Sequence, residues 1–578
     1  MVLKKVLNIL DKNQSKKFYI CGFLNFIFAI LELIGLLSLS VIVLLIISPD
    51  TYLEKLNNFD LIFFEQAVDQ MRNLNFALYF SGLMFAITTI IKLLIKQYTI
   101  KFTINLSVET SNLLFSKYIN KKYIHLFEFT SAKLLNLANF HSARFANSVV
   151  STLLNLINSF SIIVILLISL IYVGGLKTIV SLLLVTSVCV LIYAFIRKKI
   201  QLNEKNIINS DIERQNILNQ SYNNIKYLKL SKKYTRLINL FSLFGKNYAK
   251  SLSSNQIFLH WAKPLLEICF LIIATIFITI TIDSKNVNIV DHIPIIAFFL
   301  LSFYRMIPSI QIIFQAFVHI KGSLETINII EKEINETEHQ EKKIDNENII
   351  KINFNEKIEI SSVTFSYQKG KKLFERISLE IEKNSCVAFF GKSGQGKTTI
   401  IDLISNLIEP NEGKLLVDGI EICEQSRYSY QSKIGYLSQN FYIINESIIN
   451  NVILNDENNS ENRNKAKLLL NKLFDDLEIK NLVENEKKVG ENGVKLSHGQ
   501  KQRLLLVRLL YENKEILILD EPTSSLDEKN IIKLKEILKD LKKNKTIIIT
   551  SHNKNMLEIC DNAFLVDNNK IEITPIKK

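Results

Sequence analysis

The sequence has few charged residues for its length, and its cysteines are few and scattered. Charged residues make up only 22% of the 578 residues, whereas hydrophobic residues make up 48%. This balance argues against a chain that is soluble throughout and indicates a membrane portion. The six cysteines show no C-x-x-C spacing, which favours isolated core or lipid-facing thiols. The length exceeds that of a single hydrophobic core, so two or more domains are expected.

The sequence also lacks any recognisable RNA- or DNA-binding module, although its net charge is +14. We therefore expect no nucleic acid partner and attribute the basic excess to cytoplasmic loops that face anionic membrane lipid. The basic segment 1–17 leads into an apolar segment that is too long for a signal peptide and has no clear small-residue cleavage site. We interpret it as a retained first membrane span.

The first half of the chain contains apolar segments that approach or exceed the roughly 20 residues of a membrane span. We place six spans at 18–48, 76–96, 149–173, 179–196, 256–282 and 293–317. Two long polar stretches between them, 97–147 and 197–255, contain no proline and have apolar residues at helical spacing. The spans are therefore predicted to continue as long helices outside the bilayer.

The distribution of lysine and arginine predicts the orientation of these spans. Basic residues are dense in 197–255 and sparse in the opposite loops 49–75, 174–178 and 283–292. The long stretches and both termini should therefore be cytoplasmic. Within loop 49–75, the amphipathic run 59–68 is compatible with a helix on the outer membrane surface and equally with an ordinary exposed loop.

The composition of the chain changes after residue 330. Residues 331–348 are charged and contain no aromatic residue, which predicts a solvated linker. After it, 349–578 alternates strands with helices, as a soluble α/β domain does. We thus predict an α-helical membrane domain at 1–330, with six transmembrane helices and long cytoplasmic extensions, followed by an α/β domain at 349–578.

One glycine-rich stretch fits G-x-x-x-x-G-K-[ST] without a mismatch, between an apolar strand-like run and a helix-like segment. Such a loop turns backbone N–H groups around phosphate oxygens, and the following helix N-terminus adds partial positive charge. Lys397 is placed to reach the β- and γ-phosphates of ATP, and Thr398 to offer a hydroxyl to Mg²⁺. The residues of this loop are Gly391, Lys392, Ser393, Gly394, Gln395, Gly396, Lys397, Thr398 and Thr399.

A second apolar run, 516–519, ends in Asp520 and Glu521. A buried strand that delivers an acid beside a phosphate loop suits Mg²⁺, which Asp520 would hold through water. Glu521 is placed to orient, or accept a proton from, the attacking water.

Between these two motifs, residues 496–503 read LSHGQKQR, which resembles the signature sequence of ABC ATPases. His498 stands at the third position, where LSGGQ is usual, and would either titrate or serve as a passive cap. The resemblance implies that Ser497, Gly499 and Gln500 contribute to ATP binding, with Ser497 and Gly499 presenting donors to the γ-phosphate from a helix N-terminus.

The other landmarks of ABC ATPases are present in the family's order. Tyr367 matches the aromatic residue that stacks on adenine, Gln439 the Q-loop glutamine that touches Mg²⁺, and His552 the switch histidine that contacts the γ-phosphate. Residues 490–493 resemble the exporter-specific loop, and 524–527 match the D-loop. The resemblance makes Glu521 and His552 the expected catalytic pair.

Six spans fused ahead of one such domain resemble an ABC half-transporter of the exporter type. The family builds each ATP site from the phosphate loop of one domain and the signature of another. Since this chain has one of each, a second copy is the expected partner, in a two-fold symmetric homodimer. ATP and Mg²⁺ are the expected cofactors, and the bacterial inner membrane is the expected location.

The membrane half is similar, over short stretches, to bacterial flippases of lipid-linked oligosaccharides. The similar residues are Glu32, Pro264, Glu267, 224–230 and 302–309. Charged groups within spans cost roughly 3 kcal/mol or more unless they are paired or hydrated. Arg305 either binds an anionic head group or pairs with Glu32 or Glu267 to hold helices together, and the sequence leaves both open.

The function predicted from these observations is ATP-driven export or flipping of an amphipathic substrate, in particular a lipid-linked oligosaccharide or related anionic lipid. An exporter of a peptide, a drug or another lipid is the alternative within the class. A soluble ABC ATPase conflicts with the six spans. An ABC-derived channel or sensor that does not cycle conflicts with the intact Glu521.

Overall fold

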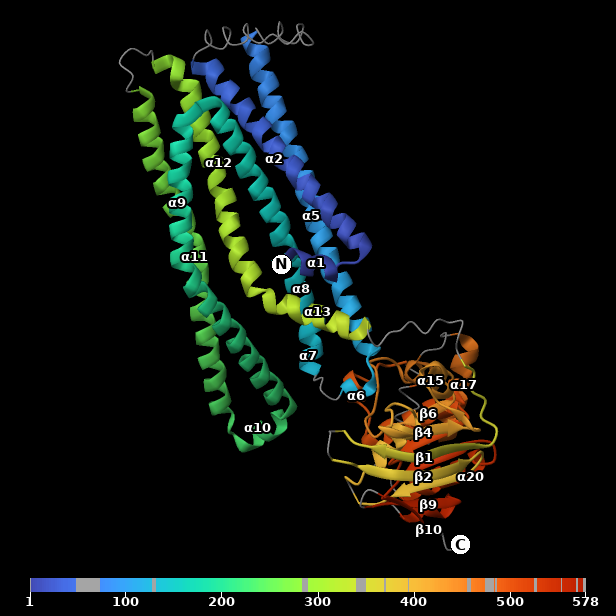
Figure 1. The fold of residues 1–578 in the computed structure, drawn as a ribbon. Helices are drawn as coiled ribbons and strands as arrows, with labels where there is room; N and C mark the ends of the chain where they lie inside the picture. Colours follow the sequence, from blue (N-terminus) through green and yellow to red (C-terminus); the bar gives the residue numbers. More distant parts are fainter. Residues whose placement is uncertain are drawn as a thin grey trace. The chain divides into compact units, whose positions relative to one another are not determined.

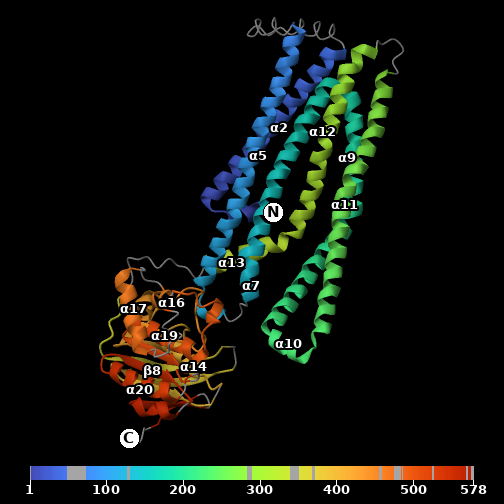
Figure 2. The same cartoon turned by 180° about the vertical axis from the view of Figure 1, so that it is seen from behind.

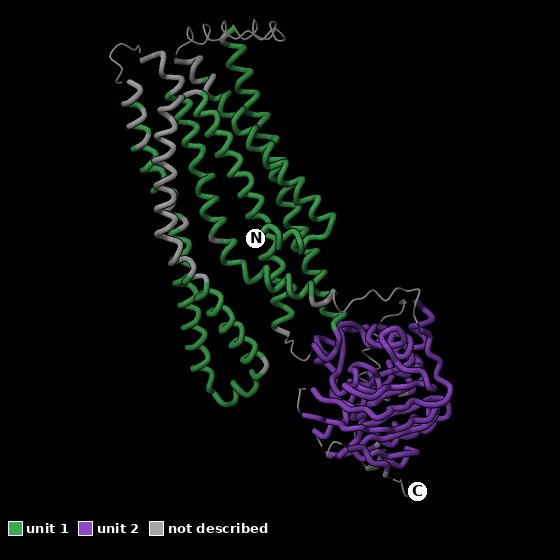
Figure 3. Tube along the Cα trace, in the orientation of Figure 1, with its two compact units in different colours: residues 1–121, 128–340 green, residues 122–127, 341–578 purple. Residues whose placement is uncertain are grey.

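The chain forms two compact units. The computed structural model describes residues 2–47, 73–126, 131–282, 289–338, 350–367, 371–392, 394–454, 459–473, 483, 486–523, 526, 528–552, 554–567 and 570–574. Unit 1 comprises residues 1–121 and 128–340, and unit 2 comprises residues 122–127 and 341–578. Figure 3 shows that the short segment 122–127 belongs with the C-terminal unit, although the chain on both sides of it belongs to unit 1.

Unit 1 is helical throughout its described part. Figure 1 shows long helices running side by side, with α9 rising from α8 and doubling back to descend beside α11. The elements are α1 (Val2–Ile9), α2 (Lys12–Ile47), α5 (Leu74–Ile119), α7 (Ser131–Leu135), η1 (Asn136–His141), α8 (Ser142–Arg144), η2 (Phe145–Val150), α9 (Ser151–Asn223), α10 (Ile225–Ser231), α11 (Tyr234–Ile282), α12 (Ile289–Gly322) and α13 (Leu324–Glu338).

Four apolar helical segments among the described residues are long enough to cross a bilayer. They are Lys12–Leu39, Asn75–Ile119, Lys133–Tyr172 and Ile296–Gly322. These segments overlap the predicted first, second, third and sixth spans. The predicted fourth and fifth spans fall within α9 and α11, where some side chains lie outside the part that the structure describes. As expected, α5, α9 and α11 continue well beyond the predicted spans.

Two predictions for unit 1 differ from the structure. The segment 174–178, expected to be a loop, is helical and lies within α9. The predicted linker begins inside α13, whose Ile334 is 7% exposed and packs with Val6 and Ile330 in one apolar cluster. Composition alone missed this helix because only one of its faces is apolar. The predicted outer helix 59–68 and linker residues 339–348 lie outside the described residues.

Unit 2 contains two sheets. The four-stranded sheet has the order β2-β1-β4-β5, and the six-stranded sheet β10-β9-β3-β8-β7-β6. In the larger sheet β9, β3, β8, β7 and β6 are parallel, and β10 is antiparallel to β9. The strands are β1 (Lys357–Phe365), β2 (Phe374–Glu382), β3 (Cys386–Phe390), β4 (Glu412–Val417), β5 (Ile420–Glu421), β6 (Ile434–Leu437), β7 (Ile516–Asp520), β8 (Thr546–Thr550), β9 (Asn562–Asp567) and β10 (Lys570–Thr574).

The helices of unit 2 cover the six-stranded sheet, and several are visible from behind in Figure 2. They are α6 (Tyr123–Leu126), α14 (Lys397–Ile404), α15 (Glu424–Gln431), α16 (Ile448–Ile453), α17 (Ser460–Leu473), α19 (His498–Glu512) and α20 (Glu528–Leu541), with the 3₁₀ turns η4 (Glu491–Gly493) and η5 (Lys554–Ile559).

Both faces of the six-stranded sheet are covered by other elements, and successive side chains of a strand point to opposite faces. In β7, Leu517 and Leu519 join a cluster with α16, α17, α19 and α20. Ile516 and Ile518 join another cluster with α14 and the four-stranded sheet. This burial on both faces explains why the run reads as continuously apolar. It also fixes the carboxyl ends of β3, β6, β7 and β8, where parallel α/β sheets bind ligands.

Candidate nucleotide site

The phosphate loop connects β3 to α14, in the context that the sequence predicted. Gly396 precedes α14 with φ 100°, a backbone conformation that favours glycine. A Cβ at this position would lie 2.9 Å from the Phe374 ring, so a larger residue would also collide. The loop can therefore turn tightly into the helix N-terminus, where backbone N–H groups are available for an anion.

Lys397 is 7% exposed and lies over its own loop. Its Nζ donates to the carbonyl oxygens of Gly391 at 3.0 Å and Lys392 at 2.9 Å. An ammonium group has three donors, which leaves one for a phosphate oxygen. Burial lowers the pKa of Lys397, while the charges of Glu521 and Asp520 oppose that shift.

The two acids at the end of β7 are held in different ways by β8. Asp520 accepts from Thr550 Oγ1 at 2.6 Å and from the Tyr436 hydroxyl at 3.4 Å. Glu521 has φ 52°, an unfavourable value for a residue with a side chain. Its N–H donates to the carbonyl oxygen and Oγ1 of Thr550 at 3.1 and 3.0 Å. These bonds stabilise the bend that separates the two carboxylates.

The carboxylate of Glu521 lies between two polar side chains from neighbouring strand ends. His552 Nε2 is 3.1 Å from Glu521 Oε1, and Gln439 Nε2 donates to Glu521 Oε2 at 3.2 Å. The structure thus brings together Glu521, His552 and Gln439. An acid oriented in this way can accept a proton from a water molecule.

The side chains predicted to hold Mg²⁺ provide oxygen donors, as this ion requires. Asp520 ends the buried strand, and Thr398 is exposed in the first turn of α14. Because Gln439 uses its Nε2 on Glu521, its Oε1 remains an acceptor. Among the described residues no group of three or more His, Cys, Asp and Glu could hold a metal alone. This donor set fits an ion that is shared with phosphates.

Tyr367 follows β1 and lies beside the phosphate-loop helix. Its hydroxyl is 3.1 Å from Thr399 Oγ1, and its ring meets Phe365 edge-on with centroids 4.9 Å apart. Burial is the main cause that raises the pKa of Tyr367. The ring is still 45% exposed, so one of its surfaces is accessible to a planar base.

The signature residues open α19, as predicted. Ser497 Oγ accepts from the N–H of Gln500 at 3.2 Å, and the Ser497 N–H donates to Gln500 Oε1 at 2.8 Å. This reciprocal capping box fixes the helix N-terminus. His498 packs against Phe441 with ring centroids 4.9 Å apart, which suits a packing role. Ser393 of the phosphate loop and Ser524, Ser525 and Asp527 of the predicted D-loop lie outside the described residues.

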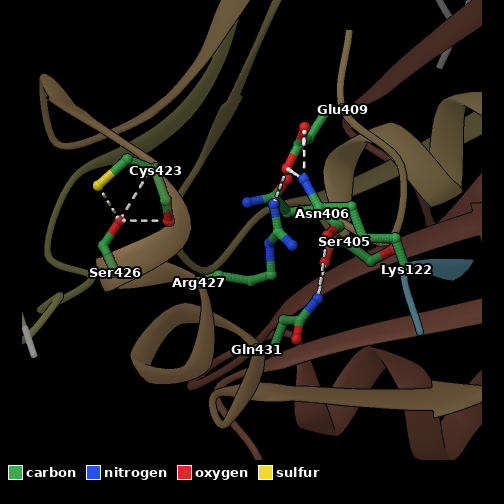
Figure 4. Close-up of polar contacts among 8 residues, drawn as sticks. All are labelled: Lys122, Ser405, Asn406, Glu409, Cys423, Ser426, Arg427 and Gln431. Atoms are coloured by element: carbon green, nitrogen blue, oxygen red, sulfur yellow. Dashed lines mark hydrogen bonds and ion pairs between the residues drawn. The ribbon is translucent and has the colours of Figure 1, made fainter. Parts of the chain in front are cut away.

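Segment 122–127 packs on the nucleotide unit and was not predicted from the sequence. Ile124 packs against the apolar cluster of the four-stranded sheet and α14. Lys122 Nζ contacts Glu409 Oε1 at 3.2 Å, and Arg427 contacts the same carboxylate (Figure 4). Burial raises the pKa of Glu409, but Arg427 and Lys122 outweigh it and hold the pKa below its usual value.

Sequence reasoning also missed groups around Asp520. Thr550 bridges both acids, yet the motif assigned a role only to His552, two positions later. Asp402 is 4% exposed on α14; burial, with the nearby charge of Asp520, raises the pKa of Asp402 to about 6. In the sequence, only its position as a single acid within the apolar segment after the loop indicates that Asp402 is buried.

A charged cluster of Glu32, Lys92 and Arg305 lies within the helices of unit 1. Lys92 Nζ is 2.9 Å from Glu32 Oε2, and Arg305 pairs with Glu32 Oε1. Of the pairings considered from the sequence, the structure shows Arg305 with Glu32, whereas Glu267 lies 3.8 Å from Lys263 on α11. The Lys92 and Glu32 side chains are 9% and 4% exposed, but Arg305 is 47% exposed.

The fold and site define a P-loop ATPase domain joined to a helical domain that has segments long and apolar enough to span a membrane. Residues 374–524 match the family model for ABC transporters. The whole chain superimposes on the structure of a bacterial Atm1-family ABC exporter with ATP bound, with a TM-score of 0.74, 16% identity and coverage of 98% of this chain and 96% of that one. Residues 374–524 of unit 2 thus resemble an ABC transporter ATPase domain, and the chain has the fold of an ABC exporter.

Curated relatives resemble this chain over part of its length. An ATP-dependent lipid A-core flippase of Haemophilus ducreyi is 32% identical over 218 residues, 37% of each chain. The corresponding flippase of Photorhabdus laumondii is 33% identical over 217 residues, again 37% of each. The uncharacterized ABC transporter ATP-binding protein y4gM of Sinorhizobium fredii is 33% identical over 215 residues, 37% of this chain and 36% of its own. The match thus spans little more than a third of these relatives.

Proposed function

We propose that this chain is one half of an ATP-driven exporter that moves an anionic amphipathic lipid across the bacterial inner membrane. The observation that carries the ATPase part is the convergence of Lys397, Glu521 and His552 at the carboxyl edge of the six-stranded sheet. The ABC exporter fold and the apolar helices of unit 1 support the transport part.

The residues of unit 2 take distinct roles in this proposal. The phosphate loop and Lys397 bind the ATP phosphates, and Tyr367 stacks on adenine. Thr398, Gln439 and Asp520 hold Mg²⁺, which neutralises phosphate charge when bound. Glu521 accepts the proton of the attacking water.

His552 lies 3.1 Å from Glu521 and orients its carboxylate. Because the 3.2 Å bond from Gln439 also ends on Glu521, the presence of Mg²⁺ at Gln439 can influence the base directly. Binding and water activation are therefore linked through one side chain.

Complete ATP sites need a second copy of the chain. Ser497 and Gln500 cap α19 and, with Gly499, present its N-terminus as an anion site, so they would close over the phosphates held by the partner copy. A two-fold homodimer then has two equivalent sites.

The segment 122–127 offers a mechanical link between the ATP site and the helices. Its Ile124 is seated on the cluster that contains α14, and the chain on either side of it returns to unit 1. Movement of α14 on ATP binding would therefore displace α5 and α7, between which this segment lies in the sequence.

The cluster of Glu32, Lys92 and Arg305 supports an anionic substrate. Two cations surround one carboxylate, so the cluster carries excess positive charge within apolar helices, where an unpaired charge costs several kcal/mol. An anionic head group would satisfy that charge, and Arg305 is exposed enough to contact it. A lipid-linked oligosaccharide is the substrate we favour. Lipid A-type lipid, suggested by the names of the partial relatives, is the second candidate.

Reconstitution of the full chain in proteoliposomes tests this function. We expect ATP to drive movement of a fluorescent polyprenyl-diphosphate oligosaccharide between leaflets, and this lipid to stimulate ATP turnover. Glu521→Gln should lower ATP turnover by at least 100-fold, in line with removal of a general base, and should stop flipping. If a lipid A-type lipid is flipped instead, the second candidate is right. If neither lipid is flipped and only a peptide or drug stimulates turnover, the lipid proposal is wrong.

A further inference from the structure

A cavity of about 830 Å³ lies in unit 1, away from the residues assigned above. It is lined by residues within 136–148, 207–215, 248–256 and 319–329. Neither the nucleotide site nor the charged cluster contributes to its wall. The volume is in the range of sites that bind small molecules or head groups.

The backbone of one wall is unusual. The π-helical segments η1 and η2 flank the short α8. Such turns are rare in helices and often occur at functional sites. Asn139, Phe140, Arg144 and Asn147 of this wall all line the cavity.

Side-chain amides are the most numerous polar groups of the lining. Because an amide both donates and accepts hydrogen bonds, it matches hydroxyl groups, which do the same. Some of these amides are oriented by the protein: Asn136 Nδ2 donates to Gln215 Oε1 at 2.9 Å, and Gln215 Nε2 donates to Asp211 Oδ2 at 3.0 Å. The amides are Asn136, Asn139, Asn147, Gln215, Asn255 and Gln256.

Asn139 and Asn147 are the two amides best placed to meet a ligand. Both are exposed, and neither side chain makes a hydrogen bond to any residue that the structure describes. They lie eight residues apart on the π-helical wall, and both line the cavity. The fold does not use their hydrogen-bonding capacity, so a ligand can.

The charges of the lining exclude a simple phosphate site. Arg144 already donates to the carbonyl oxygen of Gly322 at 2.9 Å. Asp211 and Glu325 add two carboxylates to the wall. An anion would meet more negative than positive charge here, the reverse of the situation around Arg305. Carboxylates are, however, good acceptors for neutral hydroxyl groups.

An aromatic ring completes the set. Phe140 is 44% exposed and carries the Arg144 guanidinium 5.6 Å from its ring centroid. An exposed ring offers an apolar surface on which the C–H face of a sugar ring can pack. Amides, carboxylates and an exposed aromatic ring together match a polyhydroxylated, uncharged ligand.

We propose that this cavity binds neutral sugar residues of the transported head group. The inference rests on the proposed lipid-flipping function only in naming the source of the sugar. Arg305 and His319, which lines the cavity, lie on the same helix α12, about 21 Å apart along its axis at 1.5 Å per residue. A head group with phosphates at the charged cluster and several sugars beyond them could reach both sites.

Direct binding tests the cavity without depending on transport. Free oligosaccharides of hexose and N-acetylhexosamine, without lipid, would be titrated into the detergent-solubilised full chain by isothermal calorimetry. We expect saturable binding that the double variant Asn139→Ala/Asn147→Ala weakens at least tenfold. Asn105→Ala, an exposed amide on α5 outside the cavity, is the matched control and should bind like the parent. No binding to the parent chain, or equal weakening by the control, would overturn the proposal.

A second measurement separates this inference from the proposed function. Flipping of a polyprenyl-diphosphate oligosaccharide would be compared with that of polyprenyl diphosphate without sugar. The double variant should raise the half-maximal concentration for the sugar-bearing lipid only; equal effects on both lipids would contradict a sugar site. If free sugar binds at the cavity but no lipid is flipped, the sugar site stands and the transport proposal fails.

Discussion

At the scale of single residues, the ATP site depends on groups that its motifs do not name. The Thr550 hydroxyl accepts a hydrogen bond from the Glu521 N–H and donates one to the Asp520 carboxylate. It therefore holds Asp520, the proposed metal ligand, and Glu521, the proposed base, at a set separation. A motif gives the identities of such acids, but their positions come from the neighbouring strand.

The buried acid Asp402 predicts a pH dependence of stability. Its pKa of about 6 lies above the usual value for aspartate of about 3.9, so the folded state retains a proton that the unfolded state has lost. Stability should therefore fall as pH rises from about 4 through 6. Asp402→Asn should remove this dependence and raise the Tm at pH 8, because the free energy of unfolding should increase by up to about 3 kcal/mol.

Thermal unfolding of the nucleotide-free full chain, followed at pH 5 and pH 8, measures the effect. Asp540→Asn is a suitable control because Asp540 is on the surface of α20, paired with Lys543. An Asp402→Asn chain whose Tm gain were the same at both pH values would contradict the assignment.

Glu32 is expected to be more important for stability than either cation beside it. Glu32→Gln would leave Lys92, 9% exposed, without a countercharge. Breaking a buried pair in this way costs roughly 3–5 kcal/mol. The Tm of the purified chain should drop strongly, and Glu32→Gln combined with Lys92→Met should recover much of the loss. Lack of recovery in the double variant would show that Glu32 acts otherwise.

At the scale of elements, the short helix α6 should determine how ATP use is coupled to movement. The pair of Lys122 and Glu409 is 34% and 49% exposed, so it contributes about 0–1 kcal/mol. Ile124, seated on an apolar cluster, should contribute more. Ile124→Asp is therefore expected to lower the amount of lipid moved per ATP hydrolysed, whereas Lys122→Ala should change this ratio little.

The ratio of flipped lipid to released phosphate in proteoliposomes checks this prediction. A ratio for Ile124→Asp that equals the parent value would remove α6 from the coupling. Burial, together with Asp402 and Tyr367, raises the pKa of Tyr123, so Tyr123, which precedes Ile124 in α6, lies near Tyr367.

The elements of unit 2 were largely predictable because apolar runs and motifs coincide there. The run at 386–390 became β3, and 516–519 became β7, since both strands are buried on two faces. Contacts between distant segments were not predictable. The residues around Lys92 in the sequence do not indicate that it pairs with Glu32. The residues of α6 do not differ in composition from the rest of the long polar stretch in which they lie. The docking of α6 depends on a surface that exists only after unit 2 has folded.

Amphipathic elements were the main source of error in unit 1. Residues 331–338 are rich in charge, which predicts a linker, but they form the second half of α13. Ile334 of this segment packs in the apolar cluster of unit 1. Lys5 adds an ion pair to Glu331 at 2.8 Å. Charge content misled the prediction because half of a surface helix can be charged without affecting its buried side.

At the scale of the whole molecule, the proposed composite ATP sites predict how two chains must assemble. Lys397→Ala and Ser497→Arg should each inactivate a homodimer. In a mixed dimer, however, one site would combine the intact phosphate loop of one chain with the intact signature of the other. Co-expression of the two variants should restore roughly a quarter of the parental ATP turnover if chains pair at random with two-fold symmetry.

Differently tagged chains, purified through both tags, allow this turnover to be measured on mixed dimers alone. Mixed dimers without activity would contradict shared sites, provided that the doubly tagged complex forms. Mixing Lys397→Ala with Glu521→Gln gives the matched negative control because both changes affect the same half of a site. Neither chain then has both an intact loop and an intact base, so both sites of the mixed dimer are inactive.

The allocation of residues 122–127 to unit 2 has a consequence for anyone who exchanges parts between related proteins. A chimera cut only at the boundary near residue 340 would give the new nucleotide unit a foreign α6, and Ile124 would meet a surface that was not selected to receive it. The exchangeable unit of this protein is therefore discontinuous in sequence. Residues 122–127 have to be exchanged together with residues 341–578.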